Sequence, residues 1–172
     1  MLKDVEHLND KDELTRLENL AQKLGFRVVY SVNLSFTHSL CSFYPCRKII
    51  IGTKNYSEKS NIGYGFIPDK VKALILAHEL GHITVYKRLY PNMAIADFCL
   101  SDDTEFKLKQ EIYAWKTVIN ESTDKLELEF AQEAINQYVF CEFIGTCTIE
   151  DSCRREQEII TKFARTEVYT KV

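Results

Sequence analysis

The sequence predicts an α+β fold, with a small sheet in the N-terminal part and a mostly helical half after it. Runs rich in β-branched and aromatic residues occur before residue 55, whereas apolar residues at helical spacing dominate after residue 68. At 172 residues and 45% hydrophobic content, the chain can bury one substantial core. We therefore expect a single domain over residues 1–172, with the sheet and a buried helix in about residues 1–100 and a helical subdomain in about 101–172.

The first elements follow from the spacing of apolar residues. Over residues 12–24, leucine and alanine recur at helical spacing, and Gly25 is a natural stop. Residues 26–32 are rich in β-formers and predict a strand, while 36–44 and 49–51 predict two more. These pieces are expected to form one small sheet.

A buried helix is expected to begin after Pro68. Residues 71–77 are almost continuously apolar, and no Gly or Pro follows Pro68 until Gly81. The preceding stretch, residues 55–68, contains Gly63 and Gly65 and predicts a loop that could border a cleft.

The rest of the chain is expected to be nearly all helix. Predicted helices cover residues 104–120 and 124–143. A third predicted helix opens at Thr148 with a capping box and continues past Phe163.

The buried helix carries a motif with metal-site chemistry. His78 and His82 are four residues apart, so both imidazoles project from one side of the helix and can reach a single ion, while Glu79 can act as a general base. The alternative is that the two are core histidines bonded to the backbone and that Glu79 is a paired surface acid. A metal is favoured because burying two imidazoles and a carboxylate without a partner is costly.

A zinc hydrolase usually needs a third protein ligand, and Glu111 is the leading candidate. A further histidine six residues after His82 is absent, because Arg88 occupies that position. Glu111 lies three residues after Leu108 and four before Trp115, on the apolar face of the predicted helix 104–120. A carboxylate there needs a cation, although it could also extend to solvent or pair with a basic side chain.

Other acids near this helix are weaker candidates. Glu105 is the reserve ligand, although its place in the first turn suits an interaction with the helix dipole. Asp97, Asp102 and Asp103 precede the helix, where short acids usually act as caps.

The segment His78-Glu79-Leu80-Gly81-His82, followed about thirty residues later by Glu111-Ile112-Tyr113-Ala114-Trp115, resembles the zinc site of ImmA/IrrE-type metallopeptidases of phages and mobile elements. The resemblance implies a zincin-like fold in which a sheet with an edge strand lies over the active-site helix. It implies a Zn²⁺ cofactor, with His78, His82 and Glu111 as metal ligands and Glu79 as the catalytic base. It also implies an intracellular peptidase, in many relatives one that cleaves a transcriptional repressor.

The same resemblance makes residues 48–52 the expected edge strand, to which an extended protein or peptide substrate would add. The chain departs from the family in two ways: no helix-turn-helix module is recognisable, and Tyr113 stands where many relatives carry an acid.

Candidate donors to an oxyanion are aromatic or imidazole side chains, namely His38, Tyr64, Tyr86 and Tyr113.

The leading functional hypothesis is a zinc-dependent intracellular endopeptidase acting on a protein substrate, such as a repressor or another regulator. The alternative is a zincin-fold binding or regulatory module that keeps zinc without turning over peptides; the intact Glu79 favours catalysis. A purely structural zinc protein would need a fourth protein ligand, which the sequence does not offer.

Composition limits the partners and the compartment. The net charge is −3 and the pI about 5.8, with basic residues spread along the chain, so no direct nucleic-acid binding is expected. No secretory leader or membrane-length apolar stretch is recognisable, which predicts a cytoplasmic protein with no membrane partner. The six cysteines are then expected to be reduced, and most of them to be small core residues.

Overall fold

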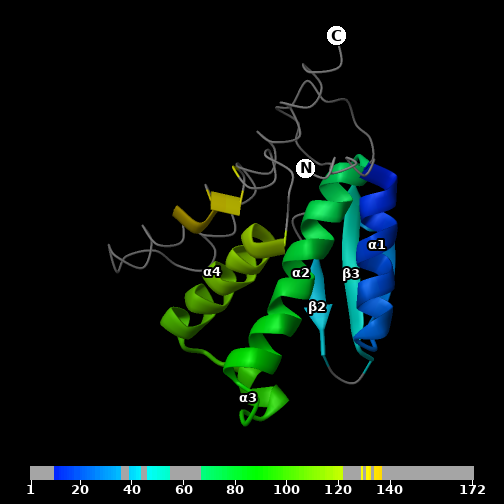
Figure 1. Ribbon diagram of the computed structural model, residues 1–172. Helices are drawn as coiled ribbons and strands as arrows, with labels where there is room; N and C mark the ends of the chain where they lie inside the picture. The colour runs from blue at the N-terminus through cyan, green and yellow to red at the C-terminus, as the bar shows by residue number, and fades with distance from the viewer. Residues whose placement is uncertain are drawn as a thin grey trace, which may run out of the picture.

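A computed structural model of the chain describes residues 10–35, 39–43, 46–54, 67–121, 129, 131, 132 and 134–136 (Figure 1). Over these residues the protein is mostly helical with a small three-stranded sheet, which confirms the predicted α+β class. In chain order the elements are α1 (Asp10–Lys23), β1 (Arg27–Ser35), β2 (Leu40–Ser42), β3 (Lys48–Lys54), α2 (Asp69–Leu89), α3 (Ile95–Leu100) and α4 (Thr104–Glu121).

Helix α1 ends where the sequence predicts, at Gly25. This glycine has a φ of 84°, a left-handed conformation that costs a residue with a side chain far more than it costs glycine. The Gly25 N–H donates to the Gln22 carbonyl, and the Phe26 N–H donates to the Ala21 carbonyl, both at 2.9 Å. These two bonds form a Schellman motif, which satisfies the last carbonyls of the helix and turns the chain into β1.

The order of the strands corrects one prediction. The order is β1-β3-β2, with β3 parallel to β1 and antiparallel to β2. Strand β3, which contains the predicted edge segment 48–52, therefore lies in the centre, and β1 and β2 are the edges of the described sheet. Ile49 and Ile51 are fully buried, as expected for a central strand under helices. The edge prediction was wrong because β2 returns on the outer side of β3, and sequence patterns do not specify strand order.

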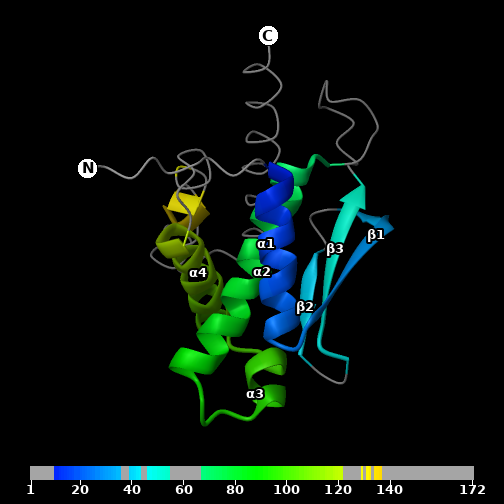
Figure 2. The same ribbon diagram turned by 45° about the vertical axis from the view of Figure 1, so that its right-hand side comes forward.

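The helices form two layers beside the sheet. Helices α1 and α2 pack against one face of it, and α2 lies between the sheet and α4 (Figures 1 and 2). Helix α2 is the centre of the core, with Val71, Leu74, Leu76 and Ile83 fully buried. The 21-residue helix thus contacts strands on one side and a helix on the other.

An aromatic cluster joins β2 to the helices. The ring of Phe43 makes edge contacts with Phe26, Tyr86 and Phe98 at centroid distances of 5.6, 5.5 and 5.7 Å. Phe43 directly follows β2, so this contact holds the short edge strand against α2 and α3.

The start of α4 was predicted correctly. Asp103 Oδ1 accepts a hydrogen bond from the Phe106 N–H at 3.1 Å, as an N-cap does. Helix α3 was not predicted. The predicted helix 124–143 is described only at residues 129, 131, 132 and 134–136, which are helical. The helix predicted to open at Thr148 lies outside the described residues, and so does the predicted loop 55–68 except for residues 67 and 68.

Among the described cysteines, none is buried. Cys41 is half-buried, Cys46 and Cys99 are exposed, and all three are free thiols. The prediction that most cysteines are core residues is therefore wrong for Cys46 and Cys99, whereas Cys41 packs against the core; the other three cysteines lie outside the described residues. In the described part of the chain, no helix combines the length and apolar character needed to cross a membrane.

Candidate metal centre

Helix α2 presents three polar side chains from an otherwise apolar stretch. His78 and Glu79 are buried, and His82 is nearly so, with 13% of its side chain exposed. The two imidazoles lie one turn apart on the helix, as their spacing predicts, and their Nε2 atoms are 3.2 Å from each other. Because their Nε2 atoms face each other, the geometry disfavours the alternative of two core histidines that each bond separately to the backbone.

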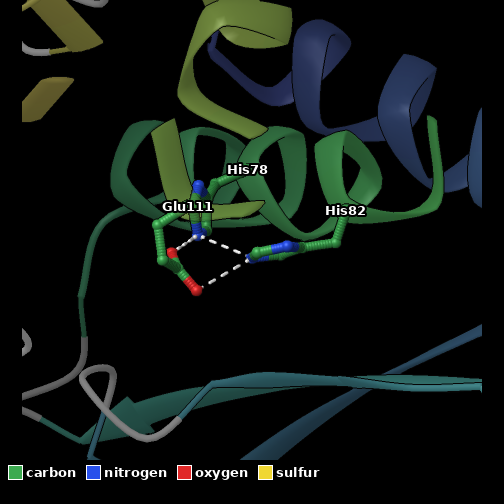
Figure 3. Close-up of side chains that lie close together, drawn as sticks. All are labelled: His78, His82 and Glu111. Carbon is green, nitrogen blue, oxygen red and sulfur yellow. Dashed lines mark hydrogen bonds and ion pairs between the residues drawn. The ribbon is translucent and has the colours of Figure 1, made fainter. Parts of the chain in front are cut away.

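Glu111 reaches the same point from α4. Its Oε2 lies 3.1 Å from His78 Nε2, and its Oε1 lies 3.4 Å from His82 Nε2 (Figure 3). Its side chain is 32% exposed. The structure thus brings together the three residues that the sequence proposed as ligands, from two helices that are neighbours in space.

These distances fit the requirements of a metal ion. For a tetrahedral ion with nitrogen and oxygen ligands at about 2.0–2.1 Å, neighbouring ligand atoms lie about 3.3 Å apart. The three contacts of 3.1, 3.2 and 3.4 Å match that separation. Two Nε2 atoms this close cannot both carry a proton without repulsion, whereas two lone pairs directed at one cation are compatible. His78, His82 and Glu111 can therefore hold a metal ion.

Trp115 fixes the orientation of one ligand. Its ring stacks on the imidazole of His78 at a centroid distance of 4.2 Å and an interplanar angle of 27°. Trp115 is 1% exposed and lies on α4, four residues after Glu111. The stack restricts rotation of the His78 ring, and so keeps Nε2 directed at the Glu111 carboxylate.

The two carboxylates of the site are perturbed in opposite directions. Burial alone would raise the pKa of Glu111, but the adjacent imidazoles of His82 and His78 outweigh it and lower that pKa. Burial raises the pKa of Glu79, and Glu111 adds to the effect, while the two histidines oppose it only in part. Glu111 is thus held ionised, as a ligand must be, and Glu79 binds a proton more readily than an ordinary glutamate, as a base requires.

The alternative ligands are not at the site. Glu105 is exposed and forms an ion pair with Lys109 on the surface of α4. Asp103 caps α4, and Asp97 and Asp102 are exposed. The reserve assignments for the third ligand are therefore not supported by the geometry.

Of the candidate oxyanion donors, two lie in described segments. Tyr86 donates its hydroxyl to the Met93 carbonyl at 2.9 Å, so that hydroxyl is already engaged. Tyr113 follows Glu111 by two residues, which places it about 200° around the helix from Glu111, on the exposed side. His38 and Tyr64 lie outside the described residues. Neither of the two described donors is therefore placed to act at the metal centre.

Sequence reasoning did not predict which edge strand contacts the helix that carries the site. Burial raises the pKa of the Cys41 thiol on β2, and the negative charge of Glu79 adds to the effect. Both β3, which contains residues 48–52, and the edge strand β2 contact α2, the helix that carries the candidate base. The stack of Trp115 on His78 was also not predicted, although Trp115 closes the second of the two segments that carry the resemblance.

Comparison with known proteins found no relative of this chain. No protein-family model, no curated protein and no solved structure matches the chain.

Proposed function

We propose that the protein is a zinc-dependent endopeptidase that hydrolyses a peptide bond in an intracellular protein substrate. The observation that carries the proposal is the convergence of His78, His82 and Glu111 within one tetrahedral site, with Glu79 beside it. A set of two imidazoles and one carboxylate is typical of catalytic zinc, because three protein ligands leave a fourth position for water. We also propose that the protein has a zincin-like fold and that its site is similar to that of ImmA/IrrE-type peptidases.

The mechanism follows from the positions of the side chains. A zinc ion held there would supply a Lewis acid and lower the pKa of water towards about 7. His78, His82 and Glu111 would hold it, and the stack with Trp115 would keep His78 oriented. Glu79 would accept the proton of the attacking water and pass it to the departing amine. Its raised pKa suits both steps, since a base must also release its proton.

Substrate binding is expected at β2. An extended peptide can add to an exposed strand edge through main-chain hydrogen bonds, and β2 is a described edge strand that contacts α2, the helix that carries Glu79. Leu40, which is 44% exposed, and Ser42 then face the opposite side from Cys41. The side chains around β2, rather than those along β3, would influence sequence preference.

The decisive experiment compares the zinc-loaded wild type with Glu79→Gln. The substrates are a peptide library and candidate repressor proteins encoded near the gene, with products read by mass spectrometry. Loss of a general base typically costs about 10²–10⁴-fold in rate, so the variant should lose cleavage while it keeps bound zinc. Glu105→Gln is the matched control, because Glu105 is exposed and paired only with Lys109 on the helix surface.

Two results would contradict the proposal. Cleavage that persists in Glu79→Gln would exclude Glu79 as the base. Zinc binding by the wild type with no cleavage of any substrate would favour a binding or regulatory module that keeps the metal.

A further inference from the structure

Gly81 lies where α2 touches the backbone of α4. A Cβ atom built on Gly81 would meet the carbonyl oxygen of Ala114 at 2.6 Å, its Cα at 2.9 Å and its carbonyl carbon at 3.1 Å. Real Cβ contacts under 3.0 Å are essentially absent from proteins. Because the opposing atoms belong to the backbone, no side chain can rotate away. Only glycine allows the two helices to approach this closely.

This contact is adjacent to all three candidate metal ligands. Gly81 follows His78 by three residues and directly precedes His82. Ala114 follows Glu111 by three residues, so it lies on the neighbouring position of the same helix face. This close contact of α2 and α4 therefore lies within one turn of the residues whose imidazoles meet the carboxylate.

We propose that Gly81 is a positioning residue for the metal centre, in that the contact with Ala114 sets the separation of α2 and α4 at which Glu111 completes the ligand set. The inference rests on the proposed metal site. Restoring an ordinary contact of 3.4 Å would separate the two backbones by about 0.8 Å, whereas metal–ligand distances tolerate about 0.2 Å. Glu111 already reaches the imidazoles at 3.1 and 3.4 Å, and no natural acid has a longer side chain.

The intrinsic helix propensities of glycine and alanine predict the opposite effect of a Gly81→Ala substitution, namely a more stable protein. Glycine is among the poorest residues in a helix interior, so replacing it by alanine stabilises a helix where space allows. Gly81→Ala should instead weaken metal binding, since the added methyl group pushes the helices apart.

The experiment measures Zn²⁺ affinity by competition with a chromophoric chelator, and the absorption spectrum of the Co²⁺-substituted protein. Gly81→Ala is expected to weaken Zn²⁺ binding by about 10–100-fold, the range seen when a residue that orients a ligand is lost. It should also weaken the intense visible bands of tetrahedral Co²⁺. The control is Val118→Ala, which removes volume from a buried position on α4 without placing atoms between the helices. Its Zn²⁺ affinity and Co²⁺ spectrum should match those of the wild type, even though its stability falls.

The outcomes separate this inference from the proposed function. If the wild type and His82→Ala bind Zn²⁺ equally, the metal centre itself is refuted. If His82→Ala loses Zn²⁺ but Gly81→Ala retains wild-type affinity and spectrum, only the role of Gly81 is refuted. If Gly81→Ala does not fold, Ala114→Ser enlarges the fully buried residue whose backbone Gly81 contacts, and unchanged affinity there would overturn the inference.

Discussion

Replacing Phe43 by leucine is expected to lower the free energy of unfolding by about 2–4 kcal/mol. The ring is 7% exposed and makes edge contacts with three aromatic rings, those of Phe26, Tyr86 and Phe98. Each such pair contributes about 0.5–1.5 kcal/mol beyond its buried area, so losing three costs roughly 1.5–4.5 kcal/mol. Leucine keeps most of the apolar volume, which limits the additional cost of a cavity.

Urea unfolding of the metal-free protein measures this loss directly through the shift in midpoint at constant m-value. Thermal unfolding gives a second measurement, with a drop of about 2–4 °C expected per kcal/mol for a chain of this size. Phe106→Leu is the matched comparison, because Phe106 is only half-buried and contacts two rings, Tyr90 and Phe98. It should cost less than Phe43→Leu.

The same variant tests what the cluster does for the site. Phe43 anchors β2, but it contacts none of the three candidate ligands, so zinc affinity should not change while peptide binding at β2 weakens. The reasoning is refuted if Phe43→Leu costs no more stability than Phe106→Leu, or if it releases zinc while peptide binding is unaffected.

The other predictions concern the metal ligands and the base. His82→Ala and Glu111→Ala are each expected to weaken Zn²⁺ binding by more than about 100-fold, measured by titration calorimetry, since each removes one of three ligands rather than a residue that only orients one. If the Glu111 variant binds as much zinc as the wild type, the third metal ligand must be a residue other than Glu111. Glu79→Gln is expected to stabilise the metal-free protein above pH 7, because burial raises the pKa of Glu79 above 4.5 and its ionised form is unfavourable in the fold. The gain should shrink as the pH falls through the raised pKa and disappear below 4.5, where the carboxyl is protonated in both the folded and the unfolded state; denaturant midpoints across pH that show no such trend would contradict it.

Much of the local structure could be predicted from particular residues. The helical spacing before Gly25 gave α1, and the left-handed conformation at that glycine explains its end. The position of Glu111 between Leu108 and Trp115 predicted a carboxylate facing inward, and it meets both imidazoles. These predictions succeeded because helix periodicity fixes which side chains share a face, whatever the helix packs against.

The failures concern contacts between segments far apart in the chain. Residues 48–52 have the alternation of a strand, but whether β2 lies outside β3 depends on how the chain returns, which alternation does not encode. Likewise, Tyr86 is a reasonable donor by its residue type, yet its hydroxyl is bonded to Met93. The cysteines were assigned to the core by composition, whereas Cys46 and Cys99 are exposed.

The sequence by itself determined that two imidazoles share one face of a buried helix and that an acid lies on the apolar face of a later one. Only the tertiary structure decided that these faces meet at 3.1 to 3.4 Å, with Trp115 stacked on His78 and Gly81 against the Ala114 backbone. The physical reason is that residues three or four apart are placed by local hydrogen bonding of the helix. The distance between two helices is set instead by the size of the side chains where they touch.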